Sequence, residues 1–158
     1  MAERDGDGWV HCDCGAKHWG VNGAAGILLV DVEHDVALLQ LRAEWTHGGQ
    51  TWGIPGGARD SHESAVQAAI RELEEELKIT HDLVDVIHDV LLTDHGTWSY
   101  HTVIGLLGST AALEVNEESV EARWISIEEI HGFDLHPGLA EVWPELKRQL
   151  REVIDARQ

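Results

Sequence analysis

A run of glutamates near the end of one predicted helix is the part of this sequence best suited to chemistry. The segment 56–79 contains Glu72, Glu75 and Glu76 within five consecutive positions. At 3.6 residues per turn, their side chains lie within about a hundred degrees of one another. Like charges four residues apart destabilise a helix by roughly 0.2–0.5 kcal/mol per pair, and a bound divalent cation would offset that repulsion. The spacing therefore favours a metal-binding edge on a helix.

The other positions of this segment predict an amphipathic helix that holds the carboxylates against the protein. Apolar side chains fill the arc beside the glutamates, which is typical of a core-facing stripe. They are Val66, Ala69, Ile70, Leu73 and Leu77. Asp60 and Glu63 have the spacing of a capping box, so we expect the helix to begin near Asp60. Gly56 and Gly57 come before it and let the backbone turn sharply and approach a ligand closely.

Strand patterns flank this helix on both sides in the chain. Runs of apolar or alternating residues predict strands at 22–31, 36–42, 51–54, 83–93, 97–107 and 122–126. A brief helical turn is expected at 127–131, and a last helix at 144–156 with Pro144 in its first turn. Strands and helices interleave in one α/β unit. We therefore expect a single domain at 21–158, preceded by an irregular segment at 1–20.

The charge of the chain excludes some classes of partner. Eleven basic residues stand against 29 acidic ones, which gives a net charge of −18 over 158 residues. Non-specific binding to nucleic acid or to an anionic membrane needs a basic surface, so neither is expected. The chain has no apolar signal core and no apolar run of membrane-spanning length. We expect a cytoplasmic protein.

Two cysteines and two histidines lie close together near the N-terminus. His11, Cys12, Cys14 and His18 could be arranged as a zinc site. The usual zinc pattern has a C-x2-4-C pair with a second pair well downstream, and that pattern is absent. The preferred interpretation is a pair of free, inert thiols in a surface segment.

The glutamate helix and the glycine turn before it resemble the signature of the Nudix hydrolase family, G-x5-E-x7-R-E-U-x-E-E-x-G-U, where U is a bulky aliphatic residue. The positions in register are Gly57, Glu63, Arg71, Glu72, Leu73, Glu75, Glu76 and Ile79. One fixed position differs, because Lys78 stands where the pattern has a glycine that ends the helix in the left-handed conformation. Lysine there would cost about 1 kcal/mol if the backbone keeps that shape.

The resemblance implies a fold and a metal cofactor. The fold is an α/β/α sandwich with a mixed β-sheet between helices. The cofactor is Mg²⁺, with Mn²⁺ as a substitute, held by Glu72, Glu75, Glu76 and the backbone at Gly56. The implied reaction is attack by water on a phosphorus of a diphosphate linkage.

The resemblance also implies roles for individual residues. The catalytic set is Glu72, Glu75, Glu118 and Arg71, in which Arg71 braces a carboxylate. Glu72 is the first choice as general base, and Glu118 or Glu121 of the later acidic loop are the alternatives. The substrate-binding set is Gly57, Glu63, Trp98 and Tyr100. Buried aromatic residues in strands are more often part of the core, so a nucleobase contact, if made, is expected first at Trp98.

The substrate implied is a small nucleoside diphosphate derivative. The compact chain resembles MutT-like members, which favours a nucleoside triphosphate, including oxidised ones. No proline occurs between Pro55 and Pro137, which counts against the ADP-ribose-specific members. Two alternatives stay open: hydrolysis of nucleotide sugars or dinucleoside polyphosphates, and a non-catalytic nucleotide-binding regulatory module. The family includes dimers, so a homodimer is left open as well.

Overall fold

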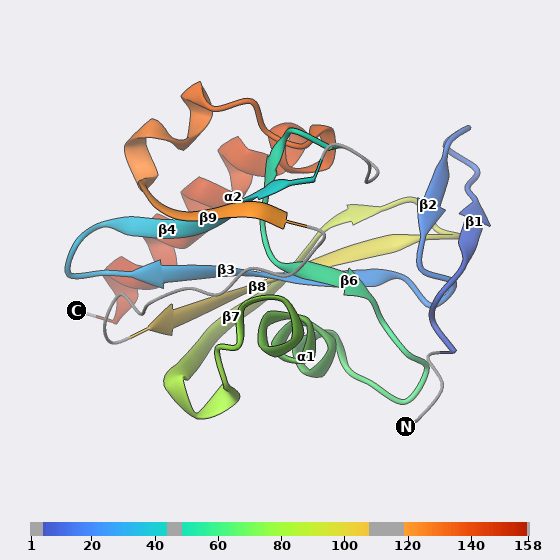
Figure 1. Ribbon diagram of the computed structural model, residues 1–158, viewed down its shortest axis with the longest axis horizontal. Coiled ribbons are helices and arrows are strands. Elements are labelled where there is room, and N and C mark those ends of the chain that lie inside the picture. Colours follow the sequence, from blue (N-terminus) through green and yellow to red (C-terminus); the bar gives the residue numbers. More distant parts are fainter. Residues whose placement is uncertain (1–4, 44–48, 108–118, 158) are drawn as a thin grey trace.

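The computed structural model describes residues 5–43, 49–107 and 119–157 of the chain (Figure 1). The elements are β1 (Trp9–His11), β2 (Lys17–Trp19), β3 (Ala24–Asp31), β4 (Val36–Arg42), β5 (Trp52–Gly53), β6 (Gly56–Ala58), α1 (Ala65–Leu77), the 3-10 turn η1 (His81–Leu83), β7 (Val84–Asp94), β8 (Ser99–Leu107), β9 (Ser119–Ser126), the 3-10 turn η2 (Ile127–Gly132) and α2 (Pro137–Ala156). Most of the acidic loop expected at 114–121 lies outside the described residues.

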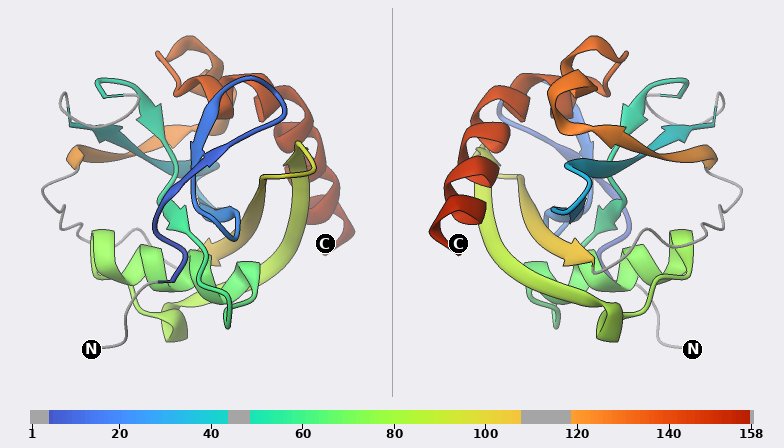
Figure 2. Two further views of the ribbon diagram at one scale, coloured as in Figure 1. Left: turned by 90° about the vertical axis from the view of Figure 1, so that its right-hand side faces the viewer. Right: turned by 90° about the vertical axis from the view of Figure 1, so that its left-hand side faces the viewer.

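A mixed sheet of seven strands forms the middle layer. Its order is β5-β4-β3-β8-β7, with β6 paired to β3 and β9 paired to β4. Only the β3–β8 pair is parallel among the described pairs of this sheet. The two helices α1 and α2 cover opposite faces of the sheet (Figures 1 and 2). The predicted α/β/α sandwich is confirmed.

Two apolar cores fill the spaces between these layers. One packs α1 against the sheet through Ala68, Leu73 and Leu77. The other packs α2 against the opposite face through Leu146 and Leu150. Every residue of β3 is buried, because this central strand is covered on both faces. A rigid, doubly covered strand thus supports the segment that carries the glutamates.

Helix α1 begins later than the sequence pattern predicted. Its N-cap is Ser64, which forms a capping box with Gln67. Asp60 is not the cap, because its carboxylate accepts a hydrogen bond from the Gly6 amide at 3.0 Å. The Glu63 side chain still accepts from the Asp60 amide at 2.9 Å, so half of the expected exchange exists as a turn before the helix.

The end of α1 keeps the family geometry without its glycine. Lys78 is the C-cap, with φ 59° and ψ 27° in the left-handed region. Its amide donates to the Glu74 carbonyl, and its Nζ donates to the Glu75 carbonyl at 3.3 Å. The residue therefore adopts the conformation that glycine usually supplies, at the energetic cost of a side chain with positive φ.

The N-terminal segment is not irregular, contrary to expectation. Strands β1 and β2 form an antiparallel hairpin in which Trp9 pairs with Trp19. The two indoles pack edge to face 5.2 Å apart and remain 45% and 43% exposed, so they hold the hairpin together rather than anchor it to the body. The hairpin lies beside the connection between β7 and β8 (Figure 1). The division into a segment at 1–20 and a domain at 21–158 stays a prediction.

The last helix starts seven residues earlier than predicted. Pro137, not Pro144, takes the first-turn position, and the His136 ring accepts from the Gly138 amide at 3.1 Å to cap it. Pro144 lies inside the helix, where it cannot donate to the carbonyl of Ala140, which is exposed. Neither α1 nor α2, the described α-helices, is long and apolar enough to span a membrane.

Candidate active site

Arg71 connects the carboxylates that the sequence placed in one group. Its Nε and Nη2 donate to both oxygens of Glu63 at 2.7 and 2.8 Å. Its Nη1 donates to Glu72 at 2.8 Å and to Glu75 at 3.4 Å. Nη2 also reaches the Ala58 carbonyl at 3.0 Å. The guanidinium therefore fixes the end of β6, the turn before α1 and the glutamate edge of α1 relative to one another.

The same contacts shift the pKa values of Glu63 and Arg71. Hydrogen bonds from Arg71 are the largest cause that lowers the pKa of Glu63, and the Asp60 amide adds to it against the effect of burial. Hydrogen bonds to Glu63 in turn raise the pKa of Arg71. Both groups are thus held in their charged forms near neutral pH.

Glu72 lies directly over the backbone of the glycine turn. Its carboxylate occupies the space beside Gly57, where an added Cβ would come within 2.6 Å of an oxygen. The residue is only 8% exposed. A glycine at 57 is therefore required by the close approach of this carboxylate, which explains why the signature fixes both positions.

Glu76 is also buried and is held from the sheet side. It is 5% exposed, and its two oxygens accept from the Gly56 amide at 2.9 Å and from Gln40 Nε2 at 3.3 Å. Gln40 Oε1 is buried and has no hydrogen-bond partner within the described part of the chain. Gln40 was not among the predicted site residues, because it lies inside an apolar strand 36 residues before Glu76. The one sequence feature that could have indicated its role is that Gln40 is a polar residue within a buried apolar run.

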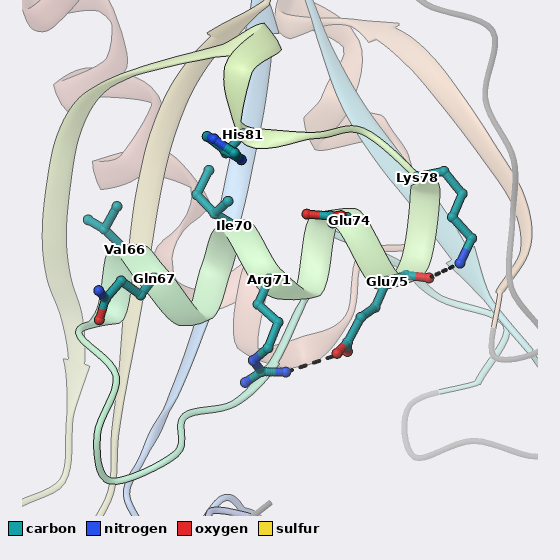
Figure 3. A pocket seen from close by; sticks show the side chains of 8 residues that line it. All are labelled: Val66, Gln67, Ile70, Arg71, Glu74, Glu75, Lys78 and His81. Atoms are coloured by element: carbon teal, nitrogen blue, oxygen red, sulfur yellow. Dashed lines mark hydrogen bonds and ion pairs between the residues drawn. The ribbon is translucent and has the colours of Figure 1, made fainter. Parts of the chain in front are cut away.

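Glu75 faces outward and is the most accessible of the three carboxylates. Its side chain is 38% exposed and points toward Arg71 along the surface of α1 (Figure 3). An open hollow follows this face of the helix toward Lys78. It is lined by Val66, Gln67, Ile70, Arg71, Glu74, Glu75, Lys78 and His81. The buried and the accessible carboxylates thus lie on one helix edge, at the boundary between protein and solvent.

Tyr100 lies on the inner side of the same group. A Cβ built at Gly26 or Gly56 would come 2.0 or 2.8 Å from its hydroxyl, so the phenol rests on these glycines. Burial, with the Glu76 carboxylate as the next cause, raises the pKa of Tyr100, while Arg42 opposes the shift. The hydroxyl therefore stays protonated beside the carboxylates and can act as a donor.

Trp98 is placed differently from its predicted use. The His18 ring stacks on it at 4.2 Å between centroids and 15° between planes. Its Nε1 donates to the Trp19 carbonyl at 3.1 Å. One face of this indole is therefore occupied by the N-terminal hairpin. A contact between Trp98 and a nucleobase stays a prediction.

The candidates for a further catalytic glutamate are only partly placed. Glu118 lies outside the described residues. Glu121 lies on β9, where its carboxylate accepts from Arg123 at 2.5 Å. Arg123 in turn lies 5.3 Å over the ring of Trp52, which is in the core next to Phe133. Trp52 is thus a core residue, as the alternative interpretation of aromatic strand residues expected.

The donor set matches a hard divalent cation. Carboxylate and carbonyl oxygens are the ligands that Mg²⁺ and Mn²⁺ prefer. Glu72 and Glu76 meet the backbone of the glycine turn, and Glu75 lies beside them on the side of Arg71. The buried Gln40 Oε1 beside Glu76 could accept a hydrogen bond from a water on such an ion. The residues present therefore fit a hydrated divalent metal.

Comparison with known proteins gives consistent matches. The sequence model described as NUDIX domain matches residues 21–146. The chain is 43% identical over 151 residues to "Putative 8-oxo-dGTP diphosphatase 3" of Mycobacterium tuberculosis, covering 90% of this chain and 70% of that protein. It is 41% identical over 162 residues to a nucleoside triphosphate pyrophosphatase/Nudix hydrolase fusion protein of Bifidobacterium longum, covering 96% of this chain and 33% of the relative. The crystal structure of RenU, a Nudix hydrolase from M. smegmatis, aligns with a TM-score of 0.84 at 39% identity over 96% of both chains.

Proposed function

Because this chain belongs to the Nudix family and is a nucleotide pyrophosphohydrolase, we propose that it uses Mg²⁺ to hydrolyse a nucleoside triphosphate to the monophosphate and pyrophosphate. The observation that carries the proposal is the glutamate edge of α1, where Arg71 holds the buried Glu72 and the accessible Glu75, and the Gly56 amide holds the buried Glu76. The relative from M. tuberculosis, named for 8-oxo-dGTP, supports an oxidised purine nucleotide as the substrate.

The metal would be held by oxygens that the fold has already positioned. Glu72, Glu75 and Glu76 supply carboxylates, and Gly56 supplies its backbone carbonyl. When bound, Mg²⁺ lowers the pKa of a water and neutralises charge on the phosphates. That neutralisation matters here, because a chain with a net charge of −18 repels a polyphosphate.

Residues of this chain would perform the remaining steps. Glu72 takes the proton of the attacking water as the general base, and the hydrogen bond from Arg71 orients its carboxylate. Oxygen from water forms a bond to phosphorus while the bond to the leaving pyrophosphate oxygen breaks. Glu63 acts through Arg71, because both of its oxygens accept from the guanidinium, and we therefore propose a positioning role for it.

Tyr100 is proposed to contact the substrate through its protonated hydroxyl. The phenol rests on Gly26 and Gly56, next to the carboxylate of Glu76. A neutral donor at this point binds a phosphate oxygen without adding charge to the site. The homodimer left open by the sequence stays a prediction.

The test is product analysis with purified protein. Phosphate and pyrophosphate release would be measured with 8-oxo-dGTP, dGTP, a nucleotide sugar and a dinucleoside polyphosphate, each with Mg²⁺, Mn²⁺ or chelator. We expect pyrophosphate from the triphosphates, preference for the oxidised nucleotide, and no turnover with chelator. Glu72→Gln and Glu76→Gln should each lower kcat by about 10²-fold or more, as expected when a group of a metal-dependent hydrolytic site is removed.

A matched control is available on the same helix. Glu74 is exposed on α1, and its carboxylate is not part of the Arg71-centred group, so Glu74→Gln should leave turnover unchanged. Preference for a nucleotide sugar or dinucleoside polyphosphate would replace the proposed substrate by the alternative class. Binding of nucleotide with no turnover on any compound would contradict the catalytic proposal and support the regulatory module.

A further inference from the structure

Four side chains from two distant segments meet at the N-terminal hairpin. Cys12 and Cys14 lie in the turn between β1 and β2, His18 lies in β2, and His95 follows β7. One donor atom from each lies within 4.8 Å of all the others. Cys14 Sγ is 3.1 Å from His18 Nε2, and Cys12 Sγ is 3.5 Å from His95 Nδ1. The cluster is separate from the glutamate site on α1.

The chemistry and the spacing of these donors suit one metal in particular. Zinc binds thiolate sulfur at about 2.3 Å and imidazole nitrogen at about 2.0 Å in a tetrahedron, which places sulfur and nitrogen about 3.5 Å apart. The distance from Cys12 Sγ to His95 Nδ1, 3.5 Å, matches that value, and the distance from Cys14 Sγ to His18 Nε2, 3.1 Å, is slightly shorter. Mg²⁺ is a hard cation that prefers oxygen ligands, so the two thiolates disfavour its binding to this cluster.

We propose that these two cysteines and two histidines bind a structural zinc ion. The zinc pattern of the sequence could not identify this site, because one of its ligands lies far away in the chain. His11 was the fourth candidate by proximity in the chain, but the structure supplies His95, which lies 83 residues from Cys12, through the turn after β7. His11 is exposed and is not one of the four clustered residues.

The surroundings of the cluster hold its ligands in place. Thr97 Oγ1 donates to Cys12 Sγ at 3.4 Å, and the Cys14 amide donates to the same sulfur at 3.5 Å. Stacking on Trp98 fixes the ring of His18. Donors aimed at a sulfur and a fixed imidazole orientation are what a metal centre requires from its neighbours.

A zinc ion here would stabilise the hairpin further. A two-stranded hairpin is marginal by itself, and both of its tryptophans are largely exposed. The ion would join the hairpin to the β7–β8 connection, which contains Trp98. Tyr100, which lies beside the glutamate site, is the second residue of the strand that follows, β8. The proposal does not depend on the proposed substrate.

The test is elemental analysis of protein purified without chelator in Mg²⁺-containing buffer. We expect about one zinc ion per chain, and loss of most of it in Cys14→Ser and His18→Ala. His11→Ala is the matched control and should retain the zinc. Glu76→Gln should retain it as well, so failure at this site can be told apart from failure at the catalytic site.

A second measurement does not depend on any variant. Replacement by Co²⁺ should give thiolate-to-cobalt charge transfer and the intense visible bands of a tetrahedral ion, and metal removal should speed proteolysis within residues 1–20. A wild-type chain that holds no zinc and gives no thiolate charge transfer would overturn the proposal. A Cys12–Cys14 disulfide in freshly isolated protein, seen as a mass lower by two hydrogens, would do so too.

Discussion

At the scale of single residues, the site depends on how closely side chains approach backbone. Glu72 has its carboxylate against Gly57, and Glu76 accepts from the Gly56 amide. Arg71 then ties Glu72 to the turn before α1. Each carboxylate is fixed by a partner on another element. A displacement of about 1 Å or less should therefore lower kcat before it lowers the stability of the fold.

Gly57→Ala tests this dependence directly. The φ of Gly57 is not positive, so alanine fits the backbone there, but its Cβ would fall 2.6 Å from a Glu72 oxygen and push the carboxylate away. We expect kcat to fall by about 10²-fold while the melting temperature changes little, since a misplaced catalytic group costs about that much. Gly132→Ala is the control, because an added Cβ there meets no atom within 4 Å. Equal activity of both variants would show that the position of Glu72 does not limit turnover.

Residues that act within one helix could be predicted from sequence, and those brought together by strand pairing could not. Glu72, Glu75 and Glu76 follow from the period of a helix. Gln40 and His95 depend on the order of the sheet and the path of the hairpin, which local patterns do not encode. The stacking of His18 on Trp98 could not be predicted for the same reason.

At the scale of elements, the strand positions were predicted well and the helix ends less well. Alternation and apolar runs place β3, β4, β7 and β8 within a few residues of their bounds. The start of a helix depends on which of several nearby residues caps it. Ser64 caps α1 in place of Asp60, and His136 caps α2, which begins at Pro137 instead of Pro144, each by accepting a hydrogen bond from a backbone amide. The end of α1 at Lys78 was predicted correctly, because the register of the signature fixes it.

Lys78→Gly should stabilise the protein. Lysine holds φ at 59°, where a side chain costs about 1 kcal/mol relative to glycine, and the amide bond to Glu74 is kept by either residue. We expect the free energy of unfolding to rise by about 1 kcal/mol in denaturant titrations. Lys78→Ala removes the Nζ contact but keeps the strain, so it should not be stabilised. A gain in the alanine variant equal to that in the glycine variant would assign the effect to charge instead.

At the scale of the whole molecule, the excess of acid governs the response to pH. The net charge of −18 at pH 7 makes the folded chain repel itself, and lowering the pH toward the pI of 4.8 relieves that repulsion. Further acidification lowers the stability, because it must protonate several carboxylates whose pKa values are lowered by ion pairs. Hydrogen bonds from Lys147 and Arg151 lower the pKa of Glu128 to about 2, and hydrogen bonds from Arg148 lower the pKa of Glu145 to about 2.

The stability of the protein should therefore be greatest at mildly acidic pH, and the turn between β3 and β4 contributes to this. The His34 ring pairs with Asp31 at 2.7 Å, and this hydrogen bond raises the pKa of His34 above its usual 6.5 and lowers that of Asp31 below 3.8. The His34 contribution is fully present below pH 6.5 and is lost as the pH rises through its folded pKa. The Asp31 contribution is present above pH 3.8 and is lost as the pH falls through its folded pKa.

Denaturant titrations from pH 3 to 9 check both signs. The free energy of unfolding should rise from pH 8 to about pH 5.5 and fall below about pH 4, where the paired carboxylates protonate. His34→Gln should reduce the rise on the alkaline side and leave the acid limb in place, because Glu63, Glu128 and Glu145 keep their partners. His131, which is exposed in η2, provides a control substitution that should leave the curve unchanged. If His34→Gln has the same pH profile as the wild type, self-repulsion alone accounts for the alkaline limb and the Asp31–His34 pair contributes nothing measurable.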